Sequence, residues 1–315
     1  MSAAALVPRQ ALVLTAGLGT RLRPLTDVRA KPAIPVAGEP IVRRILRWCA
    51  ASGVVDLVLN LHHLPATLTA VVGDGRDLGV RVRYSWEQPN VLGSAGGPRL
   101  ALPIVGAERF LIVNGDTMTD LDVGALATAH AAAGALVTLA LVPNTEPARY
   151  GGVALAGDRS VTGFVRRGPS AGGSFHFIGV QIAEASVFHS LRAGEAAASI
   201  GGLYDRVIAG RPGAVRGFVS QAAFWDVGTP ADYLKTSAAF AAGAPSPIGR
   251  GTRIDPSARM TDCILWDDVE VGARCRLHRC IATDGVRVPS GSDYENAILI
   301  RREDASVAVT PINHA

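Results

Sequence analysis

The fold is decided near the start of the chain, by residues 10–32, QALVLTAGLGTRLRPLTDVRAKP. The first part of this stretch, QALVLTA, is a continuous apolar run that ends at Gly17, which is typical of a strand buried on both faces of a parallel sheet. Gly17 and Gly19 have no side chains, so their backbone N–H groups can approach and cradle a phosphate. Arg21 and Lys31 then supply positive charge. The stretch therefore predicts a strand followed by a phosphate-binding loop, and it matches neither the GxGxxG pattern nor a P-loop.

Similar apolar runs recur further along and alternate with segments of helical spacing. The predicted strands are residues 54–61, 80–84, 110–113 and 135–142, and the predicted helices are 41–52 and 123–133. This alternation predicts βαβ units, and hence an α/β fold with a Rossmann-like, mostly parallel sheet. Three later segments, 151–156, 160–166 and 175–182, lie closer together, and we interpret them as antiparallel strands that cover a site as a lid or flank.

The pattern changes after Phe240. The stretch AAGAPSPIG at 241–249 predicts a linker, which divides the chain into a large domain, 1–243, and a C-terminal segment, 244–315. Beyond the linker, aliphatic residues recur every six positions at Ile248, Ile254 and Met260, and in a shifted register at Val271 and Leu277. Such hexapeptides predict a short left-handed parallel β-helix. Because Trp266 interrupts the period, an irregular β segment is the alternative.

Composition excludes several classes of protein. The chain has 48% hydrophobic and 18% charged residues, which predicts a globular protein rather than a disordered one. Its net charge of +4 is scattered without any Lys/Arg-rich run, so we expect small anionic substrates and no nucleic acid. No apolar run approaches the roughly 20 residues that span a bilayer, and the first residues do not resemble a secretion signal. We therefore expect a cytoplasmic protein that does not bind a membrane.

The cysteines and lysines are informative by their number and spacing. The four cysteines form no CxxC pair, which indicates free thiols rather than a metal site or a disulfide framework. Of the 31 basic residues only Lys31 and Lys235 are lysines. In a chain so rich in arginine, a lysine at position 31 indicates a need for a compact ammonium group.

Two aspartates follow apolar segments at positions where ligands bind. Asp116 ends the run LIVNGD, and the carboxyl ends of parallel strands form the ligand edge of an α/β sheet. Asp226 lies in the run FWDVGTPADY, in which Thr229 and Pro230 predict the start of a helix. A further glycine-rich run at 88–97, QPNVLGSAGG, predicts a loop that opens another helix.

Together these segments resemble the sugar-1-phosphate nucleotidyltransferases, whose signature GxGTRLxPxT is matched at residues 17–26 and is followed here by Lys31-Pro32. The resemblance covers about residues 10 to 240. It implies an enzyme that joins a nucleoside triphosphate to a sugar 1-phosphate with release of pyrophosphate. It also implies that the nucleotide is bound by Leu14, Ala16, Gly17, Gly19, Thr20, Gln88 and Gly93.

The same resemblance implies the catalytic groups. Arg21 and Lys31 neutralise the triphosphate, and Asp116 and Asp226 hold Mg²⁺. The residues implied at the sugar phosphate are Gly152, Arg167 and His176. Arg167 is the expected substitute for a lysine, because the Glu-Lys-Pro that many family members carry is replaced here by Arg-Arg-Gly-Pro at 166–169.

The chain shares features with two branches of the family. The segment His176–Val180 resembles the N-acetylmuramate-1-phosphate uridylyltransferases, whereas the hexapeptides resemble the mannose-1-phosphate guanylyltransferases. We expect the second activity. The alternatives are a transferase that uses UTP or dTTP with N-acetylmuramate or glucose 1-phosphate, and a non-catalytic regulatory subunit that senses a nucleotide sugar. The C-terminal segment is also a candidate surface for homo-oligomer formation.

Overall fold

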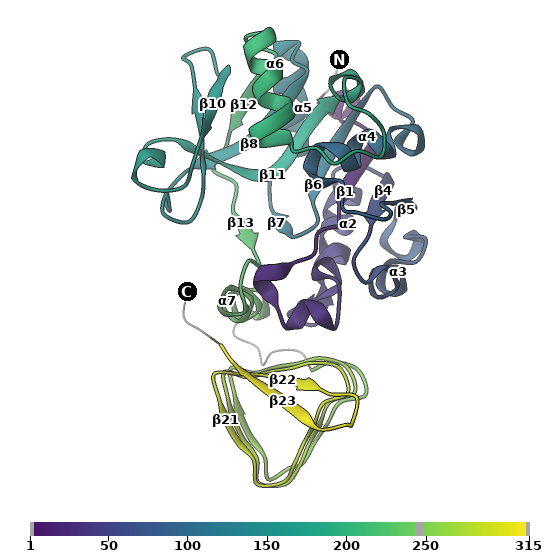
Figure 1. Cartoon of the computed structure of the whole chain (residues 1–315), viewed down its shortest axis with the longest axis vertical. Coiled ribbons are helices and arrows are strands. Elements are labelled where there is room, and N and C mark those ends of the chain that lie inside the picture. Colours follow the sequence, from purple (N-terminus) through teal and green to yellow (C-terminus); the bar gives the residue numbers. More distant parts are fainter. Residues whose placement is uncertain (1–2, 243–247, 313–315) are drawn as a thin grey trace. The chain divides into compact units, whose positions relative to one another are not determined.

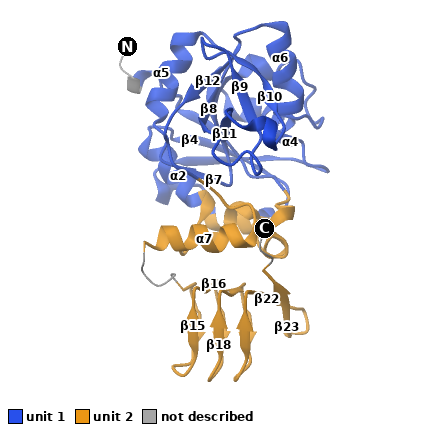
Figure 2. Ribbon diagram, turned by 90° about the vertical axis from the view of Figure 1, so that its left-hand side faces the viewer, with its two compact units in different colours: residues 1–17, 43–65, 72–224 blue, residues 18–42, 66–71, 225–315 orange. Residues whose placement is uncertain are grey.

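The computed structural model describes residues 3–242 and 248–312 (Figure 1). Packing divides the chain into two compact units (Figure 2). Unit 1 comprises residues 1–17, 43–65 and 72–224, and unit 2 comprises residues 18–42, 66–71 and 225–315. Each unit is made of three separate segments of the sequence. The predicted domains, 1–243 and 244–315, are each one continuous segment, and the division into these two domains stays a prediction.

Unit 1 is built on a nine-stranded sheet with the order β10-β9-β11-β6-β1-β4-β5; in addition, β8 pairs with β11, and β12 pairs with β8. The strands are β1 (Gln10–Leu14), β4 (Asp56–Leu61), β5 (Arg81–Trp86), β6 (Arg109–Asn114), β8 (Val137–Pro143), β9 (Gly152–Leu155), β10 (Val161–Val165), β11 (Phe175–Glu184) and β12 (Val215–Val219). The neighbours β6, β1, β4 and β5 are parallel, as are β8 and β12. The predicted α/β fold with a mostly parallel sheet is therefore confirmed.

The parallel strands are buried on both faces, which explains their continuous apolar sequences. Leu12, Val58 and Ile112 are fully buried in one hydrophobic core. Helix α4 (Gly93–Val105) packs against β1, β4 and β5, and α5 (Val123–Ala133) packs against β8, β11 and β12 (Figure 1). This covering leaves the carboxyl ends of β1, β4, β5 and β6 at one edge, where the predicted nucleotide loops begin.

The later strands are antiparallel, as expected, but they do not all form a lid. β10 pairs with β9, and β11 pairs with β6, β8 and β9, all antiparallel. β11 lies inside the main sheet, and its Val180 and Ile182 are fully buried. Its apolar residues face both sides, which is the pattern of an interior strand. Only the pair β9–β10 flanks the sheet, because a short spacing between strands does not reveal which of them enters it.

Several further elements lie between residues 3 and 210, and most of them are short. They are α1 (Ala3–Leu6), α2 (Ile41–Ala51), α3 (Pro65–Val72), α6 (Tyr204–Gly210), β7 (Thr117–Thr119), the 3-10 turns η4 (Arg76–Leu78), η5 (Pro169–Ala171) and η6 (Ala185–Phe188), and the π turn η7 (Ser199–Leu203). In the described part of the chain, no helix has the length and apolarity that crossing a membrane requires.

Unit 2 begins with the continuation of the glycine-rich loop. Residues 18–42 form three 3-10 turns and a small hairpin: η1 (Thr20–Leu22), η2 (Leu25–Asp27), η3 (Lys31–Ala33), β2 (Pro35–Val36) and β3 (Glu39–Pro40). Strand β13 (Phe224–Asp226) is followed by helix α7 (Pro230–Ala241). The helix starts with a capping box, in which Thr229 and Asp232 bond each other's backbone N–H groups.

The rest of unit 2 is a parallel β-helix. Its strands are β14 (Arg253–Ile254), β15 (Arg259–Thr261), β16 (Ile264–Leu265), β17 (Glu270–Val271), β18 (Arg276–His278), β19 (Ile281–Ala282), β20 (Arg287–Val288), β21 (Asp293–Glu295) and β22 (Ala297–Arg301), and β23 (Val307–Pro311) runs antiparallel to β22. Stacked partners such as Arg253, Glu270 and Arg287 are 17 positions apart. Val271 and Leu277 face its core. The predicted hexapeptide architecture is confirmed over the irregular alternative.

Trp266 breaks the six-residue period because its side chain serves another contact. It is fully buried, and its Nε1 donates a hydrogen bond to the Tyr233 hydroxyl on α7. The linker predicted at 241–249 falls largely at 243–247, outside the described residues.

Candidate active site

The end of β1 carries the first part of the predicted nucleotide loop. Leu14 is the last residue of β1, Ala16 is buried, and Gly17 is exposed. Between them, Thr15 is fixed by Asn60 at the end of β4: the Thr15 N–H donates to Oδ1 (2.6 Å), and the Thr15 hydroxyl donates to the Asn60 carbonyl (2.5 Å). These bonds hold the backbone of the loop at the edge of the sheet.

Asn60 is in turn held by a buried acid that the sequence analysis did not identify. Glu87 is fully buried, and its carboxylate accepts hydrogen bonds from Asn60 Nδ2 (2.7 Å) and from the Leu92 backbone (2.6 Å). A Cβ atom at Gly97 would lie 2.4 Å from the same carboxylate, so only glycine fits there. The chain Thr15–Asn60–Glu87–Leu92 therefore joins the β1 loop to the loop of residues 88–93.

The two predicted nucleotide residues of this second loop differ in their surroundings. Gln88 is exposed, immediately after buried Glu87. Gly93 has a φ of +75°, and a Cβ atom there would lie 2.9 Å from the Ala197 carbonyl, so the position requires glycine. Ala197 also accepts hydrogen bonds from the backbone of Ala95 and Gly96. The loop is thus fixed at its helical end.

Asp116 follows β6 and is partly buried. Its neighbour Gly115 donates its N–H to the Leu14 carbonyl (2.9 Å), and a Cβ atom at Gly115 would lie only 2.6 Å from that oxygen. The structure therefore brings the Asp116 backbone next to the end of β1. Within unit 1, this predicted metal residue adjoins the predicted nucleotide loop.

The three residues predicted at the sugar phosphate come from adjacent segments of unit 1. Gly152 begins β9 and pairs with Val165, the last residue of β10, after which Arg167 is exposed. A Cβ atom at Gly152 would lie 2.0 Å from the Ser174 hydroxyl, so no side chain fits. His176 lies on β11 next to Phe175, which pairs with β9.

His176 belongs to an aromatic cluster with Tyr150 and Phe224. Its ring centroid lies 4.1 Å from that of Tyr150 and 5.0 Å from that of Phe224. Burial lowers the pKa of His176 to about 4, helped by the charge of Arg149 and opposed by a hydrogen bond with Gly151. Nδ1 of His176 is buried without a hydrogen-bond partner among the described residues. At neutral pH this imidazole is uncharged, so it offers a ring face and a polar atom rather than a cation.

The first part of unit 2 holds Gly19, Thr20 and Arg21. Gly19 has a φ of +62°, and a Cβ atom there would lie 2.7 Å from the Thr26 methyl group. The Thr26 hydroxyl donates to the Gly19 carbonyl (3.0 Å), which closes the loop. Thr20 and Arg21 are exposed in η1.

Lys31 and Asp226 lie together in unit 2. Lys31 is only 9% exposed, and its Nζ lies 3.8 Å from Asp226 Oδ1. The ideal Cβ position at Gly228 lies 3.2 Å from carboxylate oxygens of Asp226 and Asp232 and 3.3 Å from Arg21 Nη1. Of the three predicted catalytic side chains of unit 2, those of Arg21 and Asp226 therefore lie next to Gly228, and that of Lys31 lies next to Asp226.

Several residues that support these groups were not predicted from the sequence. Asn60 and Glu87 fix the nucleotide loops of unit 1, and Asp232 lies beside Asp226 in unit 2. Their sequence patterns are weak: Asn60 is an amide at the end of a strand, Glu87 is a single acid before a turn, and Asp232 resembles an ordinary helix-capping residue. Contacts between separate segments reveal Asn60 and Glu87, and the shared position beside Gly228 reveals Asp232.

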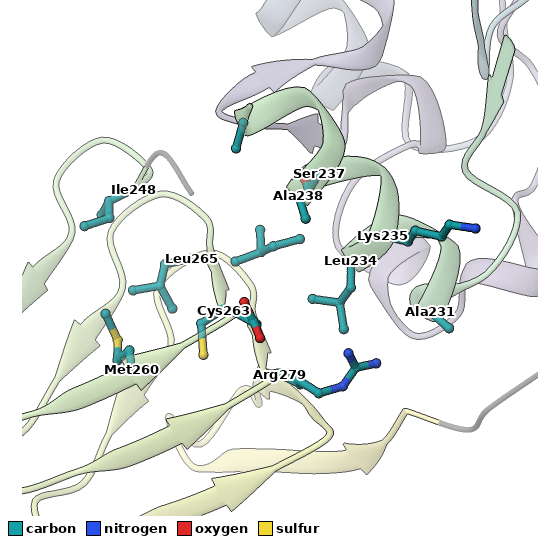
Figure 3. Close-up of a pocket in the computed structure, with 13 residues that line it drawn as sticks. Ala231, Leu234, Lys235, Ser237, Ala238, Ile248, Met260, Cys263, Leu265 and Arg279 are labelled. Atoms are coloured by element: carbon teal, nitrogen blue, oxygen red, sulfur yellow. The ribbon is translucent and has the colours of Figure 1, made fainter. Parts of the chain in front are cut away.

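Unit 2 also contains a cavity of about 590 Å³ between α7 and the β-helix (Figure 3). Its lining is largely aliphatic and includes Leu234, Ile248 and Leu265. Arg279 points from the β-helix toward α7, whereas the ammonium end of Lys235 points away (Figure 3). None of the predicted catalytic residues lines this cavity.

Models of two known protein families match the two parts of the chain that the sequence predicted. A family model described as nucleotidyl transferase matches residues 10–243, and a model of a GlmU-like C-terminal hexapeptide matches residues 242–294. The fold is similar to the crystal structure of HddC from Yersinia pseudotuberculosis, with a TM-score of 0.64 and 23% identity over 73% of this chain and 99% of that one.

Relatives of similar sequence carry related names. A mannose-1-phosphate guanylyltransferase from Mycobacterium tuberculosis is 30% identical over 90% of this chain and 82% of its own. An N-acetylmuramate alpha-1-phosphate uridylyltransferase from Neisseria meningitidis is 36% identical over 60% of this chain and 80% of its own. A heptose 1-phosphate guanylyltransferase from Aneurinibacillus thermoaerophilus is 30% identical over 72% and 96%. The chain therefore belongs to the nucleotidyl transferase family, among the sugar-1-phosphate nucleotidyltransferases.

Proposed function

We propose that this protein makes a nucleotide sugar from a nucleoside triphosphate and a sugar 1-phosphate. A phosphate oxygen of the sugar 1-phosphate attacks the α-phosphorus in line, a new P–O bond forms, and the bond to the β-phosphate breaks as pyrophosphate leaves. The attacking group is already an oxyanion, so no general base is needed. Catalysis then rests on positioning and charge neutralisation.

The observation that carries this proposal is that Asp226 lies between two cations: Lys31 Nζ is 3.8 Å from its carboxylate, and Arg21 approaches Gly228 together with it. A buried ammonium group beside a carboxylate suits the neutralisation of charge on reacting phosphates. Exposed Arg21 would bind the leaving pyrophosphate. On the sugar side, Arg167 would bind the phosphate, and the neutral ring of His176 would face the sugar.

The residues also fit a divalent metal ion, and we propose Mg²⁺. The side chains of Asp116 and Asp226 offer carboxylate oxygens, which Mg²⁺ prefers together with phosphate oxygens and water. Glycine at 228 keeps the space beside Asp226 open. Asp116 and Asp226 would hold the ion, and when bound it would supply further charge neutralisation at the phosphates.

For the substrates we favour GTP and mannose 1-phosphate. The support is that similarity to the mycobacterial mannose-1-phosphate guanylyltransferase extends over 90% of the chain, and therefore includes the β-helix. The alternative is UTP or dTTP with N-acetylmuramate or glucose 1-phosphate, which the higher identity to the meningococcal uridylyltransferase favours. A regulatory subunit without activity is the third reading, because Arg166 and Arg167 replace Glu-Lys.

The test is pyrophosphate release with GTP, UTP, dTTP, ATP and CTP, each paired with mannose, glucose, N-acetylglucosamine and N-acetylmuramic acid 1-phosphate. Each pair is measured with Mg²⁺ and with EDTA. Release from GTP and mannose 1-phosphate that EDTA abolishes is the expected result. Release from another pair would reassign the substrates, and binding of nucleotide without any release would favour the regulatory reading.

A further inference from the structure

Arg29, two residues before Lys31, forms a bidentate ion pair with the β-helix. Its Nε donates to Asp284 Oδ2 (2.7 Å) and its Nη2 to Asp284 Oδ1 (2.5 Å). Nη2 also donates to Asp267 Oδ2 (2.8 Å). The Arg29 side chain is only 13% exposed. Such charge-assisted, planar contacts fix the orientation of the guanidinium group.

The two aspartates occupy equivalent places on successive coils. They are 17 positions apart, the same spacing as the stacked partners Ile264 and Ile281 beside them. Asp284 Oδ1 also accepts the Asp267 backbone N–H (3.1 Å). Two stacked carboxylates repel each other, so the guanidinium that bridges them contributes to the stability of the stack. Asp267 has a second, weaker partner in Arg250, at 3.7 Å.

A second connection holds the same segment at its other end. The Arg29 guanidinium lies 5.2 Å from the centre of the Trp266 ring, and Trp266 Nε1 donates to the Tyr233 hydroxyl (3.0 Å). That hydroxyl donates in turn to the Pro35 carbonyl. Residues 29–35 are therefore tied to the β-helix at Arg29 and to α7 at Pro35, and Lys31 lies between the two ties.

These two ties matter because the ammonium group of Lys31 has to be placed accurately. Lysine has a flexible stem of four carbons, and its ammonium lies largely buried beside Asp226. Where the ammonium group of Lys31 can lie therefore depends on where the backbone of Lys31 is held. A misplacement of about 1 Å in a catalytic group can cost on the order of 100-fold in rate.

We propose that Arg29, Asp267 and Asp284 form a positioning cluster that makes the β-helix part of the transferase site. The cluster does not touch substrate; it fixes the backbone that carries Lys31. This inference rests on the proposed function of Lys31, and it assigns the C-terminal segment a role in turnover besides any role in assembly.

The test separates positioning from stability with four full-length variants. Arg29→Ala leaves Asp284 without its cation and Asp267 with only the weaker partner Arg250, so its melting temperature should fall along with kcat. In Arg29→Ala/Asp284→Ala the repulsion is gone and Asp267 keeps Arg250, although its N–H loses the Asp284 acceptor. The melting temperature should therefore recover in part relative to Arg29→Ala, while kcat stays about tenfold or more below wild type. KM for both substrates should stay within about threefold. Arg29→Lys, which keeps the charge but not the bidentate contact, should lie between wild type and Arg29→Ala.

The matched control is Arg253→Ala, which removes an exposed arginine paired with Glu270 at 3.5 Å in the same β-helix. It should leave kcat unchanged. If kcat in the double variant recovers together with the melting temperature, the cluster is merely structural and the proposal is wrong.

Hydrogen exchange gives a readout that does not depend on activity. In the double variant, the amides of residues 25–36 should exchange faster than in wild type, and those of β1 should not change. If wild type releases no pyrophosphate with any substrate pair, the proposed function fails, yet this exchange result still decides whether the cluster fixes the segment. Unchanged exchange in residues 25–36 would overturn the inference.

Discussion

At the scale of single residues, Asp226 is the carboxylate on which the proposed chemistry depends most. Asp226→Asn removes the negative charge beside Lys31 Nζ but keeps the shape of the side chain. We expect kcat for pyrophosphate release to fall by about 100-fold or more, the loss typical when one electrostatic group of an active site is removed. The melting temperature should change little.

Asp293→Asn is the matched control for that variant, because it neutralises an exposed aspartate of unit 2 that lies in β21. It should retain wild-type turnover. If Asp226→Asn kept turnover within a few fold of wild type, Asp226 would have no role at the phosphates.

The buried histidine of the aromatic cluster predicts a pH dependence of stability. The pKa of His176 is lowered from the ordinary 6.5 to about 4, chiefly by burial. Between these values the unfolded chain binds a proton that the folded protein does not, so stability falls as the pH drops from about 6.5 toward 4. His176→Gln should remove this contribution.

Melting temperatures at pH 7 and pH 5 measure the effect. The decrease between the two should be smaller in His176→Gln than in wild type, and unchanged in the control His189→Gln, which replaces an exposed histidine. Part of the decrease should remain in every variant, because burial also lowers the pKa of His130. An equal decrease in His176→Gln and wild type would contradict the assignment.

At the scale of elements, Glu87 joins the ends of β1 and β4 to the loop before α4. Glu87→Ala would leave Asn60 Nδ2 and the Leu92 N–H without their buried acceptor. Removing one partner of a buried charged hydrogen bond costs about 3 kcal/mol in the free energy of unfolding. Nucleotide affinity should fall as well, because both loops lose their common support.

Denaturant unfolding and nucleotide titration check this, with the exposed Glu108→Ala as the control. The control should change neither quantity. Loss of stability without loss of nucleotide affinity would show that the network supports the fold but not the site.

The elements differ in how far the sequence could predict them. Apolar runs predicted the parallel strands well, since burial on both faces leaves a continuous signature. They did not show that β11 enters the main sheet, because its neighbours β6, β8 and β9 come from distant segments. The motifs predicted Lys31 and Asp226 as site residues. They could not predict Asp267 and Asp284, which lie 238 and 255 positions from Arg29.

At the scale of the whole molecule, the two compact units cut across the order of the sequence. Unit 2 combines the loop that carries Lys31 with the β-helix, although more than 200 residues separate them. Sequence patterns report local periodicity, so they predicted two consecutive domains and could not indicate that the early loop packs with the last segment.

The edge of the β-helix predicts an assembly. Within the described residues, β23 pairs only with β22, and its Val309 is 48% exposed. An edge strand with free backbone groups can pair with the same strand of a second copy around a two-fold axis. We therefore expect a dimer of twice 32.7 kDa by light scattering.

Val309→Lys, which places a charge on that edge, should shift the mass to that of one chain while kcat stays unchanged. The control Thr261→Lys, at an exposed position on β15, should leave the dimer intact. A wild-type mass of one chain at micromolar concentration would refute the dimer, and a dimer that persists in Val309→Lys would place the interface elsewhere.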